Sequence, residues 1–168
     1  MNKKTSNATV TCLCEETPCP MARTAALIGD QWVILLLREL FRRPHRFDEL
    51  QKATSAATNI VTSRLKRMVD VGIVEKIPYQ EKPVRYEYRL SKAGLGLLPL
   101  VLEMMRYAEV WMPSHLHAPT LLRHVACGKI TKAGQTCSEC GEALGLSNLR
   151  LEKNPLGLEL PSDASAAS

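Results

Sequence analysis

A change of periodicity near the middle of the chain constrains the fold more than any other feature of the sequence. From Asn59 to about Val71 the apolar residues recur at helical spacing, and the helix is expected to stop at Gly72. The polar residues of this segment fall on one continuous helical face: Asn59, Thr62, Ser63, Lys66, Arg67 and Asp70. The period then becomes two, first around Ile73–Ile77 and again from Val84 to Leu90. An amphipathic helix followed by two short strands, with a hairpin tip at residues 80–83, predicts a helix-turn-helix that carries a β-wing.

Three shorter helical segments precede the amphipathic helix and the hairpin. The first is expected from Ala22 to Ile28, ended by Gly29, and the second follows with Asp30 as its N-cap. The third is expected from Phe47 to Ala53 and leads through a turn into the amphipathic helix. The fold class is therefore mostly α with a small β-wing.

A long final helix is predicted after the wing, capped by Ser91, reaching about Trp111 and kinked at Pro99. Its apolar residues form two stripes, and one stripe suffices to pack on the domain. The second stripe predicts a homodimer interface. The alternative is that the N-terminal helix packs on this stripe and buries it.

The chain is expected to contain four parts. Residues 1–18 form a flexible arm that contains cysteines, and residues 19–112 form the winged helix-turn-helix domain. Residues 113–155 form a Cys/His extension, and residues 156–168 form a disordered tail.

Charge restricts the class of partner. The net charge is +5, and between Arg23 and Lys92 there are 14 Lys and Arg against 8 Asp and Glu, a net of +6. A surplus concentrated in the helix-turn-helix segment favours an anionic partner. The longest apolar run, Trp32–Leu37, is far shorter than a membrane helix, so we expect a cytoplasmic, nucleoid-associated protein without a membrane partner. No Ser/His/Asp set or carboxylate pair stands out, and an enzyme is not expected.

Double-stranded DNA fits these features, with the amphipathic helix in the major groove. Four residues of the helix could reach base edges: Asn59, Thr62, Ser63 and Lys66. Five cations are expected to contact the phosphate backbone, or the minor groove from the wing: Arg46, Arg64, Arg67, Lys82 and Arg85. The alternatives are a merely solvated helix face, or a winged-helix adaptor that binds proteins without DNA specificity.

The C-terminal cysteines have the spacing of a structural metal site, His124-x2-Cys127-x9-Cys137-x2-Cys140. Gly128 and Gly141 follow two of the cysteines, as tight ligand turns require, and thiolates with imidazole suit tetrahedral Zn²⁺. We therefore predict a small zinc-knuckle-like extension. His115 or His117 could replace His124, and free thiols on a loose tail are the alternative.

The N-terminal cysteines, Cys12, Cys14 and Cys19, suggest a redox role. Cys19 stands just before a helix start, where the dipole favours the thiolate, and a second thiol could resolve an oxidised Cys19 as a disulfide. The alternatives are a small buried apolar Cys19, or a metal site made by the three cysteines.

Taken together, several segments resemble the HxlR-type winged helix-turn-helix regulators, which are close to the MarR group. They are Cys19-Pro20 with Arg23, residues 29–32, 36–40, 46–50, 64–68, 72–74 and 84–90, and Gly94–Trp111. The resemblance implies a prokaryotic homodimer that represses or activates nearby genes from a pseudo-palindromic operator, most simply as a repressor. It also implies a response to oxidants or electrophiles through Cys19. Another hypothesis is a small-molecule effector pocket beside the dimer helix, lined by Trp32, Met104, Met105 and Trp111.

Overall fold

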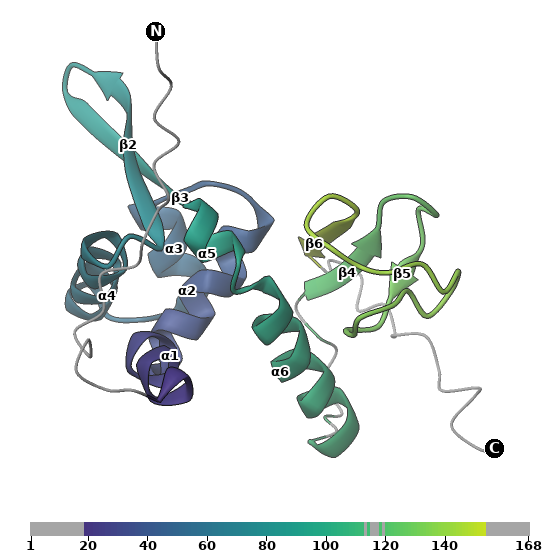
Figure 1. Cartoon of the computed structure of the whole chain (residues 1–168). Coiled ribbons are helices and arrows are strands. Elements are labelled where there is room, and N and C mark those ends of the chain that lie inside the picture. The colour runs from purple at the N-terminus through teal and green to yellow at the C-terminus, as the bar shows by residue number, and fades with distance from the viewer. Residues whose placement is uncertain (1–18, 113, 115–117, 119, 154–168) are drawn as a thin grey trace, which may run out of the picture. The chain divides into compact units, whose positions relative to one another are not determined.

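The structure is a computed structural model that describes residues 19–112, 114, 118 and 120–153. It divides into two compact units, Met1–Leu97 and Leu98–Ser168 (Figure 1). The arm and the tail expected at residues 1–18 and 156–168 lie outside the described residues, and so do Cys12, Cys14, His115 and His117.

The described part of the first unit contains five helices, a short strand and a wing. The elements before the wing are α1 (Pro20–Ile28), α2 (Gln31–Arg42), β1 (His45–Arg46), α3 (Phe47–Thr54) and α4 (Thr58–Asp70). The start of α1 is two residues earlier than expected, since Pro20 suits the first helical position. Asp30 caps α2 as predicted, its carboxylate accepting the Trp32 N–H at 2.9 Å. These helices therefore follow the local signals of the sequence closely.

The wing is the hairpin of β2 (Val74–Glu81) and β3 (Val84–Leu90), which projects from the helices of its unit (Figure 1). The strand order is β1-β3-β2, all antiparallel. Because β2 continues through Glu81, the turn is only Lys82–Pro83, tighter than the predicted four-residue tip. Strand β1 was not predicted, because two residues are too few to show an alternation.

The core of this unit joins α2, α3, α4 and the base of the wing. Its largest fully buried side chains are Leu36, Leu37, Leu50, Leu65, Met68 and Ile73. Burial of each such side chain contributes about 1.5–3 kcal/mol. Gly94 lies against the chain just before β2. A Cβ there would lie 2.1 Å from the Ile73 carbonyl oxygen, so only glycine permits this close approach. The apolar side of α4 packs into this core through Val61, Leu65 and Met68.

The single long helix predicted after the wing is wrong, because the chain forms two helices there. Ser91 caps the short α5 (Lys92–Leu95), accepting the Gly94 N–H at 3.2 Å, and α6 (Leu98–Trp111) begins after a turn at residues 96 and 97. Pro99 is the second residue of α6 instead of a kink within a helix. Proline has no N–H to donate and clashes with a preceding helical turn, so a helix accepts it in its first turn.

The second unit contains α6 and a small antiparallel sheet with strand order β5-β4-β6. Its strands are β4 (Thr120–His124), β5 (Ile130–Thr131) and β6 (Leu149–Lys153), and we refer to residues 120–153 as the ribbon. Leu121, Leu122, Thr131, Leu149 and Leu151 are buried there. None of the described helices is both long and apolar enough to cross a membrane.

Candidate nucleic-acid interface and metal centre

Helix α4 presents a polar face to solvent, as the sequence predicts. Val61, Leu65 and Met68 are buried. Four polar residues are exposed on the other side: Asn59, Thr62, Ser63 and Lys66. The Thr62 and Ser63 hydroxyls donate to helix carbonyls at 2.8 and 3.0 Å, and the Ser63 oxygen also accepts from Arg64 at 3.2 Å. A hydroxyl oxygen has two lone pairs, so each keeps at least one that can accept from a base edge. The face therefore offers donors and acceptors suited to base edges.

Two arginines of α4 make contacts inside the protein. Arg64 binds the Asp30 carboxylate through Nε and a terminal nitrogen, each 2.8 Å from Oδ2, and so joins α4 to the capped start of α2. The hydrogen bond from Arg64 is the main reason that the pKa of Asp30 is lowered. Arg67 donates to the Ala26 carbonyl in α1. Their role in phosphate binding stays a prediction, but both position α4.

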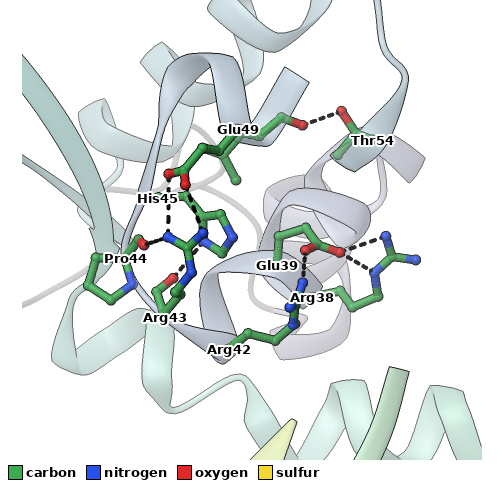
Figure 2. Close-up of polar contacts among 9 residues, drawn as sticks. Arg38, Glu39, Arg42, Arg43, Pro44, His45, Glu49 and Thr54 are labelled. Carbon is green, nitrogen blue, oxygen red and sulfur yellow. Dashed lines mark hydrogen bonds and ion pairs between the residues drawn. The ribbon is translucent and has the colours of Figure 1, made fainter. Parts of the chain in front are cut away.

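Two separate sets of polar contacts lie at the end of α2 and at the start of α3 (Figure 2). Glu39, only 3% exposed, is paired with Arg38 at 2.8 Å and Arg42 at 2.5 Å. Glu49 binds Arg43 at 2.7 Å, and its other oxygen accepts the Arg46 N–H at 2.8 Å, which caps α3. The Glu39 pairs lie within α2, whereas the Glu49 contacts tie the start of α3, the first helix of the helix-turn-helix, to the segment that follows α2.

The Glu49 pair predicts a dependence of stability on pH. The Arg43 hydrogen bond, helped by the Arg46 N–H, lowers the pKa of Glu49 from 4.5 to about 2. A carboxyl whose folded pKa is lowered contributes stability above its unfolded pKa and loses it as pH falls. We expect urea unfolding to show wild-type stability falling from about pH 4.5 to about pH 2, and Glu49→Gln to lose less over that window. Parallel pH profiles for the two proteins would contradict this role.

A cationic and aromatic groove of about 420 Å³ lies between the wing and the start of α3. The guanidinium carbon of Arg46 lies 4.3 Å from the centre of the Tyr79 ring, and Nζ of Lys76 lies 4.1 Å from the centre of the Tyr86 ring. Arg85 also lines the groove, with one carboxylate, Asp48. Sequence reasoning found Arg46 and Arg85 but missed Lys76 and the tyrosines. The pairing of β2 with β3, in which Lys76 lies opposite Tyr88, brings Lys76 close to the tyrosines, and this pairing is not visible in the sequence.

The remaining predicted residues occupy separate places. Lys82 is exposed in the turn at the wing tip. Cys19 is exposed at the N-cap of α1, so the alternative of a buried apolar Cys19 is wrong. Of the expected effector pocket, Trp32 packs against the core of the first unit, while Met104, Met105 and Trp111 belong to α6 in the second. That pocket stays a prediction.

In the ribbon, the predicted ligands converge. The ligand atoms of His124, Cys127, Cys137 and Cys140 all lie within 4.8 Å of one another. Each pair ends in a similar turn, in which the Gly128 N–H donates to the His124 carbonyl and the Gly141 N–H to the Cys137 carbonyl, both at 2.9 Å. Gly128 and Gly141 have φ of 71° and 74°, the left-handed region that favours glycine. The four residues form a cluster that could hold a metal ion.

The spacing of the donor atoms fits a tetrahedral ion. With a metal–sulfur bond of about 2.3 Å and a metal–nitrogen bond of about 2.0 Å, a tetrahedron places two sulfurs about 3.8 Å apart, and a sulfur and a nitrogen about 3.5 Å apart. Cys127 Sγ and Cys137 Sγ are 3.8 Å apart. His124 Nδ1 lies 3.3 Å from Cys127 Sγ and 3.4 Å from Cys140 Sγ. Four protein ligands leave no open position, so the site suits a structural ion.

The thiols differ in environment. Burial raises the pKa of Cys137, but hydrogen bonds from backbone N–H groups of its own loop and from Thr131 outweigh it and lower the pKa to about 6. Such N–H groups stabilise a thiolate, which is the form that binds metal. Cys140 and Cys127 are less buried than Cys137.

Comparisons with known proteins agree with this fold. The family model described as HxlR-like helix-turn-helix matches residues 27–116. An uncharacterised HTH-type transcriptional regulator of Mycobacterium tuberculosis, Rv3095, is 33% identical over 80% of this chain and 85% of its own length, and Mb3122 of Mycobacterium bovis matches equally well.

Solved structures add two informative neighbours. PA1607, described as a candidate transcription factor, shares 29% identity with a TM-score of 0.61, covering 82% of this chain and 96% of its own. The redox regulator HypR in its reduced form shares 29% identity with a TM-score of 0.52, covering 54% of this chain and 91% of its own.

Proposed function

Because this chain belongs to the HxlR-like helix-turn-helix family, we propose that it is a sequence-specific DNA-binding transcriptional regulator, acting as a repressor of nearby genes in the nucleoid of a prokaryote. The observation that carries the proposal is the exposed polar face of α4 within this fold. Asn59, Thr62, Ser63 and Lys66 would read base edges in the major groove, where Asn suits adenine and Lys suits guanine.

Cations outside α4 would also contact phosphates. Arg46, Lys76 and Arg85 surround the groove at the wing, and Lys82 stands at the wing tip. Phosphate contacts position a protein on the duplex and make its affinity dependent on salt. Arg64 and Arg67 would act mainly by holding α4 against α2 and α1.

A homodimer would place two copies of α4 on a pseudo-palindromic operator. Helix α6 supports this assembly, because Leu100, Met104, Tyr107 and Trp111 share one helix face and are all exposed, Trp111 by 69%. An exposed apolar stripe of this kind marks an interaction surface. We assign it to the α6 of a second copy.

Selection of duplexes from random DNA by the reduced, full-length protein tests the proposal. We expect a two-fold symmetric motif with half-sites about one helical turn apart. Binding that follows only salt concentration, with no enriched motif, would refute sequence-specific regulation and favour the alternative of a protein-binding adaptor.

The ribbon would hold one structural Zn²⁺ per chain. Three thiolates and one imidazole are donors that Zn²⁺ prefers, and the distances between donor atoms fit a tetrahedron. When bound, the ion would cross-link the two ligand turns.

A second candidate function is redox response through Cys19. The likeness to HypR, named as a redox regulator, and the exposure of Cys19 favour it. A peroxide or hypochlorite would oxidise the Cys19 thiolate to a sulfenic acid, and a second thiol would then form a disulfide with loss of water. Cys12 or Cys14, in the same chain or the partner copy, would supply that thiol.

Oxidation of wild-type protein is expected to change its affinity for the selected operator, whereas Cys19→Ser keeps the affinity of the reduced state. Gel-shift titrations with and without peroxide, followed by reduction with a dithiol, measure this difference. An equal response of Cys19→Ser and wild type would exclude Cys19 as the sensor. A response to small molecules instead would favour the effector-pocket hypothesis.

A further inference from the structure

The orientation of one imidazole in the ribbon carries an inference beyond the ligand set. We propose that the metal binds His124 through Nδ1 and that Glu142 accepts a hydrogen bond from Nε2–H of the same ring, which makes Glu142 the positioning residue of the site. The inference rests on the proposed zinc centre and adds a residue that the spacing of ligands does not indicate.

The distances select Nδ1 as the ligand atom. Nδ1 lies 3.3 and 3.4 Å from the sulfurs of Cys127 and Cys140, close to the sulfur–nitrogen edge of a metal tetrahedron. When Nδ1 gives its lone pair to a metal, Nε2 must carry the proton of the neutral ring. The ring then has one N–H that points away from the metal.

That N–H needs an acceptor. The His124 side chain is 0% exposed, and among the described residues its Nε2 has no hydrogen-bond partner. A buried N–H without a partner costs free energy. The carboxylate near it is that of Glu142, with Oε2 3.6 Å from Nε2, and the Glu142 side chain is 55% exposed. An approach of a few tenths of an ångström would make a hydrogen bond.

Glu142 is well placed to fix this contact, because its backbone belongs to the ligand turn. Its carbonyl accepts the Cys137 N–H at 2.8 Å, and its N–H bonds to the Cys140 sulfur. The backbone thus holds residue 142 beside the cluster of candidate ligands whatever its side chain is. Carboxylate–histidine–metal chains fix the ring orientation and raise the basicity of the ligand nitrogen.

The test compares full-length wild type, Glu142→Ala and Glu142→Gln by zinc competition with a chromogenic chelator. We expect Glu142→Ala to bind zinc about 10- to 100-fold more weakly. Glu142→Gln keeps an oxygen acceptor and should recover most of the affinity. Glu139→Ala is the matched control, since it removes the same charge from the same loop while its carboxylate contacts only Ser138 among the described residues.

Nitrogen NMR of the histidine rings supplies a second measurement that a general loss of stability would not mimic. In the zinc-loaded wild type, His124 should show a protonated Nε2 and a metal-bound Nδ1, with faster exchange of the Nε2 proton in Glu142→Ala. A metal-bound Nε2, or equal zinc affinity of Glu142→Ala and Glu139→Ala, would overturn the inference alone. Wild-type protein that binds no stoichiometric zinc would instead refute the proposed zinc centre, and this inference with it.

Discussion

Replacement of Cys137 and Cys140 together by serine is expected to abolish stoichiometric zinc binding and to unfold the ribbon. The ribbon has short strands, three of its four predicted ligands lie in the connections between strands, and its buried core is small. Metal binding to small structural sites contributes about 10–16 kcal/mol of apparent free energy, which such a core could not replace. Removal of half the ligand set should therefore cost more than any other change in this chain.

Metal analysis and amide hydrogen exchange would measure this effect. Amides of β4, β5 and β6 should lose protection in the double variant, while those of α2, α3 and α4 keep it, since the first unit has its own core. Cys19→Ser, which removes a thiol outside the ribbon, is the control and should keep its zinc. Unchanged zinc content in the double variant would refute the metal centre.

Lys66→Ala and Arg85→Ala are expected to weaken DNA binding in different ways. Lys66 lies on the exposed face of α4, so its loss should relax the preference at one base pair by about 1–3 kcal/mol. Arg85 lines the wing groove, so its loss should weaken binding to all sequences alike and lower the salt slope by about 1.

Affinities for the operator, for single-base variants and for random duplexes, each over a range of salt, separate these two roles. Lys92→Ala is a matched control, because it removes an exposed cation at the start of α5, which we assign to neither surface. Equal losses on specific and random DNA for both variants would show that the roles are assigned wrongly.

The sequence by itself determined most of the local elements and the four residues of the candidate metal cluster. Each of the signals for them involves near neighbours in the chain. They are the Asp30 cap of α2, the polar face of α4, the alternation of β3 and the glycine that follows a cysteine in each ligand turn. Helix caps, periodicity and ligand spacing act over a few residues, so they can be seen without the fold.

Only the tertiary structure decided how the long side chains are used. In the sequence, Arg64 and Arg67 look like residues that contact DNA, because they are cations on a helix of the basic segment. In the structure they bind Asp30 and Ala26, which are 34 and 41 residues away. Lys76 meets Tyr86 through the strand register, and Glu142 faces His124 across the ribbon. These contacts join residues of different helices, strands or turns, and a flexible charged side chain has several possible partners. Its partner is therefore set by which groups the folded backbone brings within reach.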